Sequence, residues 1–454
     1  MPKKKTALTI EERLQQALVP AEEQPYEVPE NWVWVRLGEV NKYVSKSVNP
    51  ISEPDKIFEL YSVPSMADDY PEIIAGSDIG SSKQSVCKED VLLCKINPRI
   101  NRVWKVSQFT DNELIASSEW IIIRNNHINA NYLMYCFQSK YFREFMLSNV
   151  SGVGGSLMRA QPKYVQTYPI PLPPLSEQQR IVESIEELFA KLDEAKERLQ
   201  EVADSFAVRK AAILHKAFTG ELTKQWRREN GVRDESWEEK KGEDFFEYVT
   251  SGSRGWAKYY SDKGSIFIRM GNLNHGTIEL DFSDIQYVEL PDQVEGQRSK
   301  LQKNDILISI TADVGMIALV REDMDAYINQ HVALARPKND LYAEFLAWYF
   351  VSNDGLQQMQ NKQRGATKIG LGLQDIRSII LKIPTLPEQH EIVRLIDDLL
   401  ARERAAQQAA EQALASIDLM KKSILARAFR GELGTNKASE ASALELLKQV
   451  LAEN

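Results

Sequence analysis

Three stretches of the chain lack acidic residues and contain Lys or Arg together with Asn or Gln. They span residues 91–110, 145–176 and 355–374. Arg and Lys bind phosphate or guanine, and Asn and Gln pair with the edge of adenine. Each stretch alone is also typical of a solvated polar loop. Two of them occupy equivalent positions in the two halves of the chain, which favours contacts in a groove of duplex DNA.

The candidate DNA contacts are basic and amide residues in these stretches and in loops beside predicted strands. In the first half they are Lys46, Lys95, Asn97, Arg99, Arg102, Lys105, Arg159 and Lys163. In the second half they are Arg254, Arg269, Asn272, Asn274, His275, Lys362, Arg364 and Lys368. The glycine-containing loops at 251–255 and 268–275 are equally compatible with ordinary turns. The corresponding segments of the first half share little with them, so two halves that both read DNA would read different sequences.

Catalytic motifs are missing from the sequence. It has no P-loop, no GxGxxG and no HExxH spacing among its five histidines. Residues 97–100 superficially resemble the Asn-Pro-Pro-aromatic motif of adenine methyltransferases, but the second proline and the aromatic residue are absent. A Pro-Asp followed by an acid-x-Lys nuclease core is not evident either. The sequence therefore predicts no catalytic residue and no metal site.

Composition sets the class of protein. A chain of 454 residues with 43% hydrophobic content predicts two or three domains. The absence of a long apolar run and of a signal peptide predicts a soluble, cytoplasmic protein. Three scattered cysteines fit a reducing compartment and are expected to be small core residues. The net charge of −9 argues against coating of nucleic acid by bulk attraction, so local charge must decide.

A repeated segment predicts the elements that hold these loops. Residues 177–182 return at 388–393, and the match continues without a gap, displaced by 211 residues, until 213–222 returns at 424–433. Each copy follows prolines and ends at a glycine, Gly220 or Gly431, as long helices do. Two helices of equal length are expected if the function of the protein depends on helix length.

Both predicted helices carry heptad seams. One seam of the first helix contains Ile181, Leu188, Ala195 and Val202, and the other contains Ile185, Leu192, Leu199, Phe206 and Ile213. The corresponding positions of the copy are Ile392, Leu399, Ala406, Ala413 and Met420, and Ile396, Glu403, Ala410, Ile417 and Ile424. A single such helix could pack on the surface of its own domain, but two equal copies favour an antiparallel pair. That pairing predicts an approximate two-fold axis, which matches the local symmetry of duplex DNA.

The predicted organisation alternates domains with helices. Residues 1–28 form an arm with a short helix opened by a Thr9/Glu12 capping box. Mixed α/β domains are expected at 29–173 and, with a linker, at 223–384, and the long helices at 174–222 and 385–433. Residues 434–454 form a tail with a short helix. Asp90–Leu93 of the first domain resembles Asp305–Ile308 of the second, which indicates a loose internal repeat.

The repeated segment and the tandem layout together resemble a known family. The resemblance is carried by Ile170–Val182 and its copy, and by the Phe-x-Gly-Glu-Leu ends at 218–222 and 429–433. They are similar to those of HsdS, the specificity subunit of type I restriction-modification systems. The resemblance implies a pseudo-two-fold α/β (mixed α+β) fold: two tandem target recognition domains, each reading half of a split double-stranded DNA target, separated by two antiparallel helices that form a coiled-coil spacer.

The resemblance also implies partners. They are two modification (HsdM) subunits, which bind S-adenosylmethionine and methylate adenine, and optionally two ATP-dependent restriction (HsdR) subunits. S-adenosylmethionine, ATP and Mg are expected in those subunits and no cofactor in this chain. Apolar residues flanking the seams, including Phe189, Leu214 and Leu400, are predicted to stay exposed for these partners. A self-contained methyltransferase or nuclease, and a coiled-coil scaffold that does not bind DNA, remain the alternatives.

Overall fold

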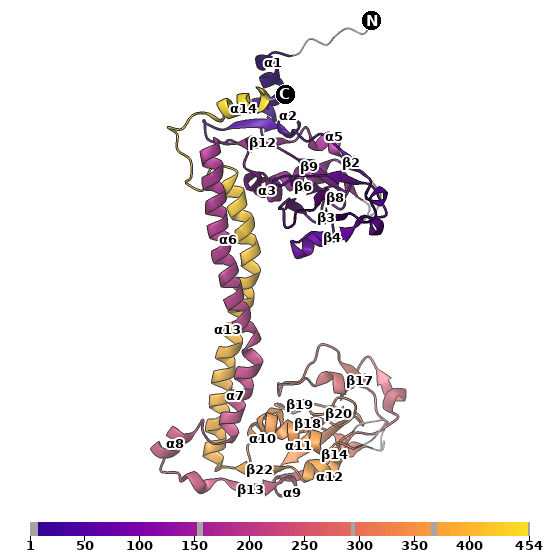
Figure 1. Ribbon diagram of the computed structural model, residues 1–454. Helices are drawn as coiled ribbons and strands as arrows, with labels where there is room; N and C mark the ends of the chain where they lie inside the picture. Colours follow the sequence, from indigo (N-terminus) through magenta and orange to yellow (C-terminus); the bar gives the residue numbers. More distant parts are fainter. Residues whose placement is uncertain (1–7, 152–157, 292–295, 365–369, 453–454) are drawn as a thin grey trace. The chain divides into compact units, whose positions relative to one another are not determined.

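The computed structural model describes residues 8–151, 158–291, 296–364 and 370–452 (Figure 1). The chain divides into two compact units. The first unit contains residues 1–198 and 413–454, and the second contains residues 199–412. The long helices contribute to both units, because the division falls within each of them.

The first unit is built on short strands. A five-stranded sheet has the order β2-β5-β8-β3-β4, with β3 and β8 parallel, and an antiparallel sheet has the order β7-β6-β9. Two antiparallel pairs, β1 with β12 and β10 with β11, complete it. The strands are β1 Val33–Arg36, β2 Ser47–Val48, β3 Ile57–Tyr61, β4 Glu72–Ala75, β5 Lys83–Ser85, β6 Val91–Cys94, β7 Val103–Lys105, β8 Glu113–Ala116, β9 Trp120–Ile123, β10 Val150–Ser151, β11 Arg159–Ala160 and β12 Pro169–Leu172.

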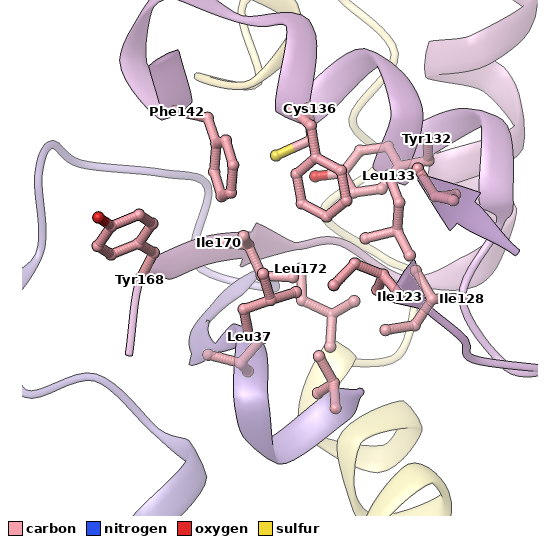
Figure 2. Close-up of a cluster of buried hydrophobic side chains, with 14 of the residues drawn as sticks. Leu37, Ile123, Ile128, Tyr132, Leu133, Cys136, Phe142, Tyr168, Ile170 and Leu172 are labelled. Carbon is pink, nitrogen blue, oxygen red and sulfur yellow. The ribbon is translucent and has the colours of Figure 1, made fainter. Parts of the chain in front are cut away.

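Short helices cover the β1–β12 pair and close the core of the first unit. Figure 2 shows Tyr132, Leu133 and Cys136 of one helix packed toward Ile170 and Leu172 of β12. The C-terminal helix adds its buried face to the same core and contacts the N-terminal one. The helices are α1 Ile10–Ala17, α2 Leu37–Val40, α3 Ala130–Gln138, α4 Lys140–Ser148, α5 Pro162–Val165 and α14 Ala443–Ala452. The predicted Thr9/Glu12 capping box of α1 is confirmed.

The second unit repeats this plan. Its sheets have the orders β14-β21-β18-β19 and β15-β17-β16-β20, with β16 and β20 parallel, and β13 pairs with β22. The strands are β13 Glu238–Lys241, β14 Phe246–Ser251, β15 Tyr260–Ser261, β16 Ser265–Ile268, β17 Gln286–Val288, β18 Ile306–Ser309, β19 Ile317–Leu319, β20 Ala326–Ile328, β21 Val332–Pro337 and β22 Ile380–Ile383. The shorter helices are α8 Lys224–Glu229, α9 Gly242–Phe245, α10 Ala343–Val351, α11 Asn353–Asn361 and α12 Leu373–Arg377.

The central strands β6 and β18 correspond to each other. Each is buried on both faces, because alternate residues of a strand point to opposite sides and both sides are apolar here. A buried aspartate precedes each strand and pairs with an arginine at 2.6 Å: Asp90 with Arg124, and Asp305 with Arg336. Burial raises the pKa of the Asp305 carboxyl, and Arg336 opposes that shift. The loose repeat seen in the sequence is therefore confirmed as a structural repeat.

The first long helix differs in its continuity from the prediction. The second is continuous, α13 Leu386–Ala428, but the first is interrupted at Ser205 into α6 Leu175–Asp204 and α7 Phe206–Phe218. Both stop signals are confirmed, since Gly220 and Gly431 have φ of +74° and +75°, which non-glycine residues rarely adopt.

Ion pairs give the direction of the helices within each unit. In the first unit Arg180 pairs with Glu440, beyond the end of α13, and Asp193 pairs with Lys421. In the second unit Arg209 pairs with Glu403, and Arg227, beyond the end of α7, pairs with Glu388. Going forward along the first helix means going backward along α13, so the pairing is antiparallel in both units.

Burial along the helices corrects the seam prediction in part. Ile185, Ile396, Ala410 and Ile417 are buried, but Val202 and Met420 are 40% and 49% exposed and Ala406 is exposed as well. Two residues predicted to stay exposed for partners, Leu214 and Leu400, are buried because they pack into the core of the second unit. Phe189 is half-buried against the first core. The prediction for cysteines holds for Cys94 and Cys136 and is wrong for Cys87, which is exposed.

The repeated Glu-Gln at the start of each long helix is buried in both units. Gln178 accepts a hydrogen bond from the Asn129 amide (2.9 Å) and donates to the Pro173 carbonyl (2.9 Å). Gln389 makes the same pair of bonds, to the Tyr342 amide (3.0 Å) and the Pro384 carbonyl (2.9 Å). Each glutamine therefore joins its helix to the domain that precedes it.

The neighbouring glutamates join each helix to the segment that follows the other helix. Glu177 accepts from the Asn436 amide and the Trp32 indole, both at 2.8 Å. Glu388 accepts from the Thr223 hydroxyl and the Arg227 guanidinium, both at 2.7 Å. Both carboxylates are fully buried, so these bonds are needed to offset desolvation.

Replacing Glu388 tests this arrangement. Glu388→Ala should destabilise the second unit by about 3–5 kcal/mol, because it removes the carboxylate that balances a buried guanidinium. The measurement is the denaturation midpoint together with hydrogen exchange in the first turns of α13. Asp398→Asn, in an exposed ion pair on the same helix, should cost less than about 1 kcal/mol. Equal losses in the two variants would contradict the assigned role of Glu388.

Candidate nucleic-acid interface

A left-handed turn follows the central strand of each unit. Asn97 has φ of +48° and Ala312 has φ of +63°, and each lies seven residues after the buried aspartate. Asn tolerates this conformation, whereas for Ala it costs on the order of 1 kcal/mol, so the surrounding contacts must enforce it. The shared turn shows that the chain leaves both central strands along the same path.

Backbone hydrogen bonds fix three segments beside this turn. In the first unit the Lys95 amide donates to Glu119 (3.0 Å), and the Lys95 carbonyl accepts from the Ala160 amide (2.8 Å). In the second unit Ile310 bonds in the same way to His331 (2.9 Å) and Leu371 (2.8 Å). We call residues 95–97, 118–119 and 159–160 the first loop edge, and residues 310–312, 330–331 and 370–371 the second loop edge.

Three predicted contacts of the first domain lie on the first loop edge. Lys95 donates to the Ser118 carbonyl at 2.6 Å. The Asn97 side-chain oxygen is buried and has no hydrogen-bond partner among the described residues. Arg159 forms an ion pair with Glu119 at 3.2 Å, and this hydrogen-bonded contact raises the pKa of its guanidinium. The edge thus presents an arginine held in place by a carboxylate.

The other predicted contacts of the first domain are spread around it. Arg99 is exposed two residues beyond the edge, and its carbonyl accepts a hydrogen bond from Arg143. Arg102 is half-buried near Cys94, whose thiol pKa is raised by burial. The remaining three are Lys46 before β2, Lys105 on β7, which pairs with Glu89 at 3.6 Å, and Lys163 on α5, which lies over the Tyr164 ring.

Predicted contacts of the second domain fall into two groups. Arg254 and Arg364 lie in segments joined to the second loop edge or its neighbours: Ser253 bridges to Asn329, and Arg364 bridges to Gly370. Arg364 pairs with Asp375 at 2.9 Å while its side chain stays 82% exposed. Lys362 ends α11 close by in sequence, and Lys368 lies outside the described residues.

The second group lies in the loop after β16. Arg269 pairs with Asp284 and His275 with Asp313, each at 2.8 Å, and Asn274 is exposed. This loop is held to α7, because the Lys210 ammonium donates to the Gly276 carbonyl. Burial lowers the pKa of Lys210. A spacer helix therefore supports the loop directly.

Asn272 has a structural role in this loop. It is 3% exposed, its oxygen accepts from the Arg269 amide at 2.9 Å, and its amide nitrogen donates to the Asp281 and Asp284 carbonyls, also at 2.9 Å. The side chain has little left to offer a base, so we leave Asn272 out of the proposed DNA surface.

Sequence reasoning did not select several residues of the loop edges. They are Ser118 and Glu119 in the first unit and Thr311, Gln330 and His331 in the second. All five lie outside the three acid-free stretches. The only signal in the sequence around them is that each is close to a predicted strand. The signal that finds them is the strand register, which pairs Cys94 with Trp120 and Ser309 with Val332 and so brings the preceding residues to the turn.

Within the described ranges, no group of three or more His, Cys, Asp or Glu side chains is arranged to hold a metal ion. Among the helices described, none is both long and apolar enough to cross a membrane.

Two mixed α/β domains with matching loop edges, each followed in the chain by a long helix, define a tandem recognition protein. The family model of the type I restriction modification DNA specificity domain matches residues 29–204 and 234–413. The chain therefore belongs to the DNA specificity family of type I restriction-modification enzymes. The two matches each cover one α/β domain and part of the helix that follows it.

Relatives and solved structures agree with this assignment. The chain is 30% identical over 306 residues to the type I restriction enzyme EcoBI specificity subunit of Escherichia coli, covering 63% of this chain and 64% of that one. It is 27% identical over 345 residues to the EcoKI specificity subunit of Escherichia coli, covering 72% of each. The HsdS subunit from Thermoanaerobacter tengcongensis has the same fold, with a TM-score of 0.69 at 22% identity over 90% of this chain and 99% of that one.

An exposed arginine beside the second loop edge provides a direct test. Arg364→Ala should weaken binding to duplex DNA by roughly 1–3 kcal/mol if a base contact is lost. Competition binding with the assembled complex measures the effect. Arg402→Ala, an arginine of similar exposure on α13, is the matched control and should have little effect. If both variants bind like the parent protein, Arg364 is not a DNA contact.

Proposed function

We propose that this chain reads a bipartite, asymmetric DNA target with its two domains and has no catalytic role of its own. The observation that carries the proposal is the pair of loop edges. Their backbones are held by the same hydrogen bonds, while their side chains differ. One scaffold used twice with different surface chemistry is what reading two different half-sequences requires.

The side chains support asymmetry of the target. The first loop edge has Lys95 and the Arg159–Glu119 pair, which offer cationic donors and a carboxylate acceptor. The second has Thr311, Gln330 and His331, which offer a hydroxyl, an amide and an imidazole. Because base edges differ in their pattern of donors and acceptors, these two sets favour different base pairs.

Partner subunits would then perform the chemistry. We infer assembly with two modification subunits, which bind S-adenosylmethionine and methylate adenine, and optionally with two restriction subunits that use ATP and Mg. Exposed apolar side chains on the long helices support such assembly: Val202 and Val208 in the second unit, and Leu419 and Met420 in the first. Partner subunits that share in enclosing DNA would also make the net charge of −9 tolerable.

Mapping of methylated adenines tests the proposal. The chain is expressed with its modification subunit in cells that lack other adenine methylation, and the methylated positions are found by long-read sequencing. The expected result is one motif with two specified halves and unspecified positions between them. Methylation by the isolated chain, or no dependence of the motif on this chain, would overturn the proposal.

Exchange of one domain should alter one half of the motif. Replacing residues 234–384 with the corresponding domain of a relative leaves the loop edge of the first unit untouched, since its three segments lie outside the exchanged range. The methylated motif should therefore keep one half-sequence and change the other. A change in both halves would mean that the domains do not read independently.

The length of the helices should set the number of unspecified positions. Four residues inserted after Leu414 in α13 add about 6 Å of helix, or nearly two base-pair steps of about 3.4 Å, if all of it is transmitted. Only one helix is lengthened and the rod can be inclined to the DNA, so about one extra base pair is expected. Both half-sequences should persist.

The matched control is the same insertion after Gly231, which has open space around it. That variant should keep the original motif. An unchanged gap in an active, well-folded Leu414 insertion variant would show that helix length does not set the spacing.

A further inference from the structure

Three polar side chains on the second loop edge form a hydrogen-bonded chain. The Thr311 hydroxyl lies 2.5 Å from His331 Nδ1, and Gln330 Nε2 lies 2.8 Å from His331 Nε2. All three residues are half-buried, so the chain is neither sealed in the core nor free in solvent. The imidazole is held from both sides, which fixes the plane of its ring.

The directions of these hydrogen bonds determine which donors and acceptors of the three side chains remain free to contact DNA. With Gln330 Nε2 as the donor, His331 Nε2 is the ring nitrogen that accepts and Nδ1 is the one that donates. Nδ1 then donates to the Thr311 hydroxyl oxygen. Gln330 retains one N–H donor and its carbonyl oxygen. A donor and an acceptor on one amide match N7 and the N6 amino group of adenine in the major groove.

The backbone beneath Gln330 is rigid. The Asn329 side chain accepts from the His331 amide at 3.0 Å, and the Asn329 carbonyl accepts from the Gly252 amide at 3.2 Å. A Cβ atom on Gly252 would lie 1.8 Å from the Ile328 carbonyl oxygen, so glycine is required for this close approach. The approach also places the loop of the exposed Arg254 against the segment that leads to Gln330. A positive charge near the amide favours DNA there.

We propose that Gln330, positioned by His331 and Thr311, reads an adenine in the half of the target recognised by the second domain. Gln330 is the specificity-determining group, and the other two are positioning residues. This inference rests on the proposed function. The adenine meant here stays stacked in the duplex, in contrast to the methylated base, which a methyltransferase must take out of the stack.

The first unit supplies the matched comparison. Ser118 and Glu119 occupy the positions that Gln330 and His331 occupy in the second unit, as the equivalent bonds of Lys95 and Ile310 show. Ser118, at the position of Gln330, carries a hydroxyl and no amide, and the neighbouring Glu119 is paired with Arg159. The same backbone therefore predicts a different base preference for the first half of the target.

The experiment uses the complex of the full chain with its modification subunits. Methylated motifs are mapped for the parent protein, Gln330→Ala, Gln330→Glu and the control Ser118→Ala. Gln330→Ala should relax one adenine position in one half of the motif and weaken binding of the parent duplex roughly tenfold to a hundredfold. Gln330→Glu keeps an acceptor toward the groove but loses the amide donor, and should shift that position toward cytosine, whose amino group donates.

Thr311→Val tests the positioning role. It should weaken discrimination at the same position without shifting it to another base, because the amide is present but less firmly held. Ser118→Ala should leave that half of the motif unchanged.

The outcomes separate this inference from the proposed function. An unchanged motif in both Gln330 variants overturns the inference, and so does degeneracy at several positions of that half together, which marks a general loosening of the domain. A parent complex that shows no bipartite motif would instead overturn the proposed function.

Discussion

The buried Glu-Gln pair at the start of each long helix is the constraint on which the rest depends. Four polar side chains with at most 1% exposure would destabilise any core unless their groups were bonded. Each glutamine bonds to the preceding domain and each glutamate to the segment that follows the other helix. Domain, helix and returning chain therefore become one body within each unit.

The buried glutamates of the two units, Glu177 and Glu388, have different hydrogen-bond donors. The comparison shows that the carboxylate is kept and its donors are not. In the first unit the Trp32 indole donates to Glu177 at 2.8 Å. The corresponding Trp237 indole has no acceptor among the described residues, and in that unit the Arg227 guanidinium and Thr223 hydroxyl bind Glu388. The carboxylate is kept while its donors change. Different sets of donors can bind the same buried carboxylate, so the residues around it can diverge as long as the acceptor stays.

Features that depend on a few neighbouring residues, such as helix caps and helix ends, were predicted from the sequence. The capping box at Thr9 and the glycine stops at Gly220 and Gly431 are read within a few residues, and the structure confirms them. Features that depend on tertiary packing were missed or misplaced. Leu214 and Leu400 lie beside the seam and are buried by a domain core that helical periodicity does not reveal. Residues such as Gln330 and His331 reach the loop edge only through strand register, which pairs residues far apart in sequence.

The loop edges show that composition alone does not reveal which polar side chains the fold leaves free. Asn272 has the right chemistry for a base contact and is used entirely by the fold, whereas Glu119 is acidic and sits on an edge, where it orients an arginine. What recognition requires is a side chain that the fold holds in place and leaves with unsatisfied donors or acceptors. The buried Asp90–Arg124 and Asp305–Arg336 pairs and the left-handed turns fix the backbone of both edges. With the backbone fixed by other residues, the edge side chains can be exchanged without loss of the fold, and a single scaffold can hold different recognition chemistry in its two copies.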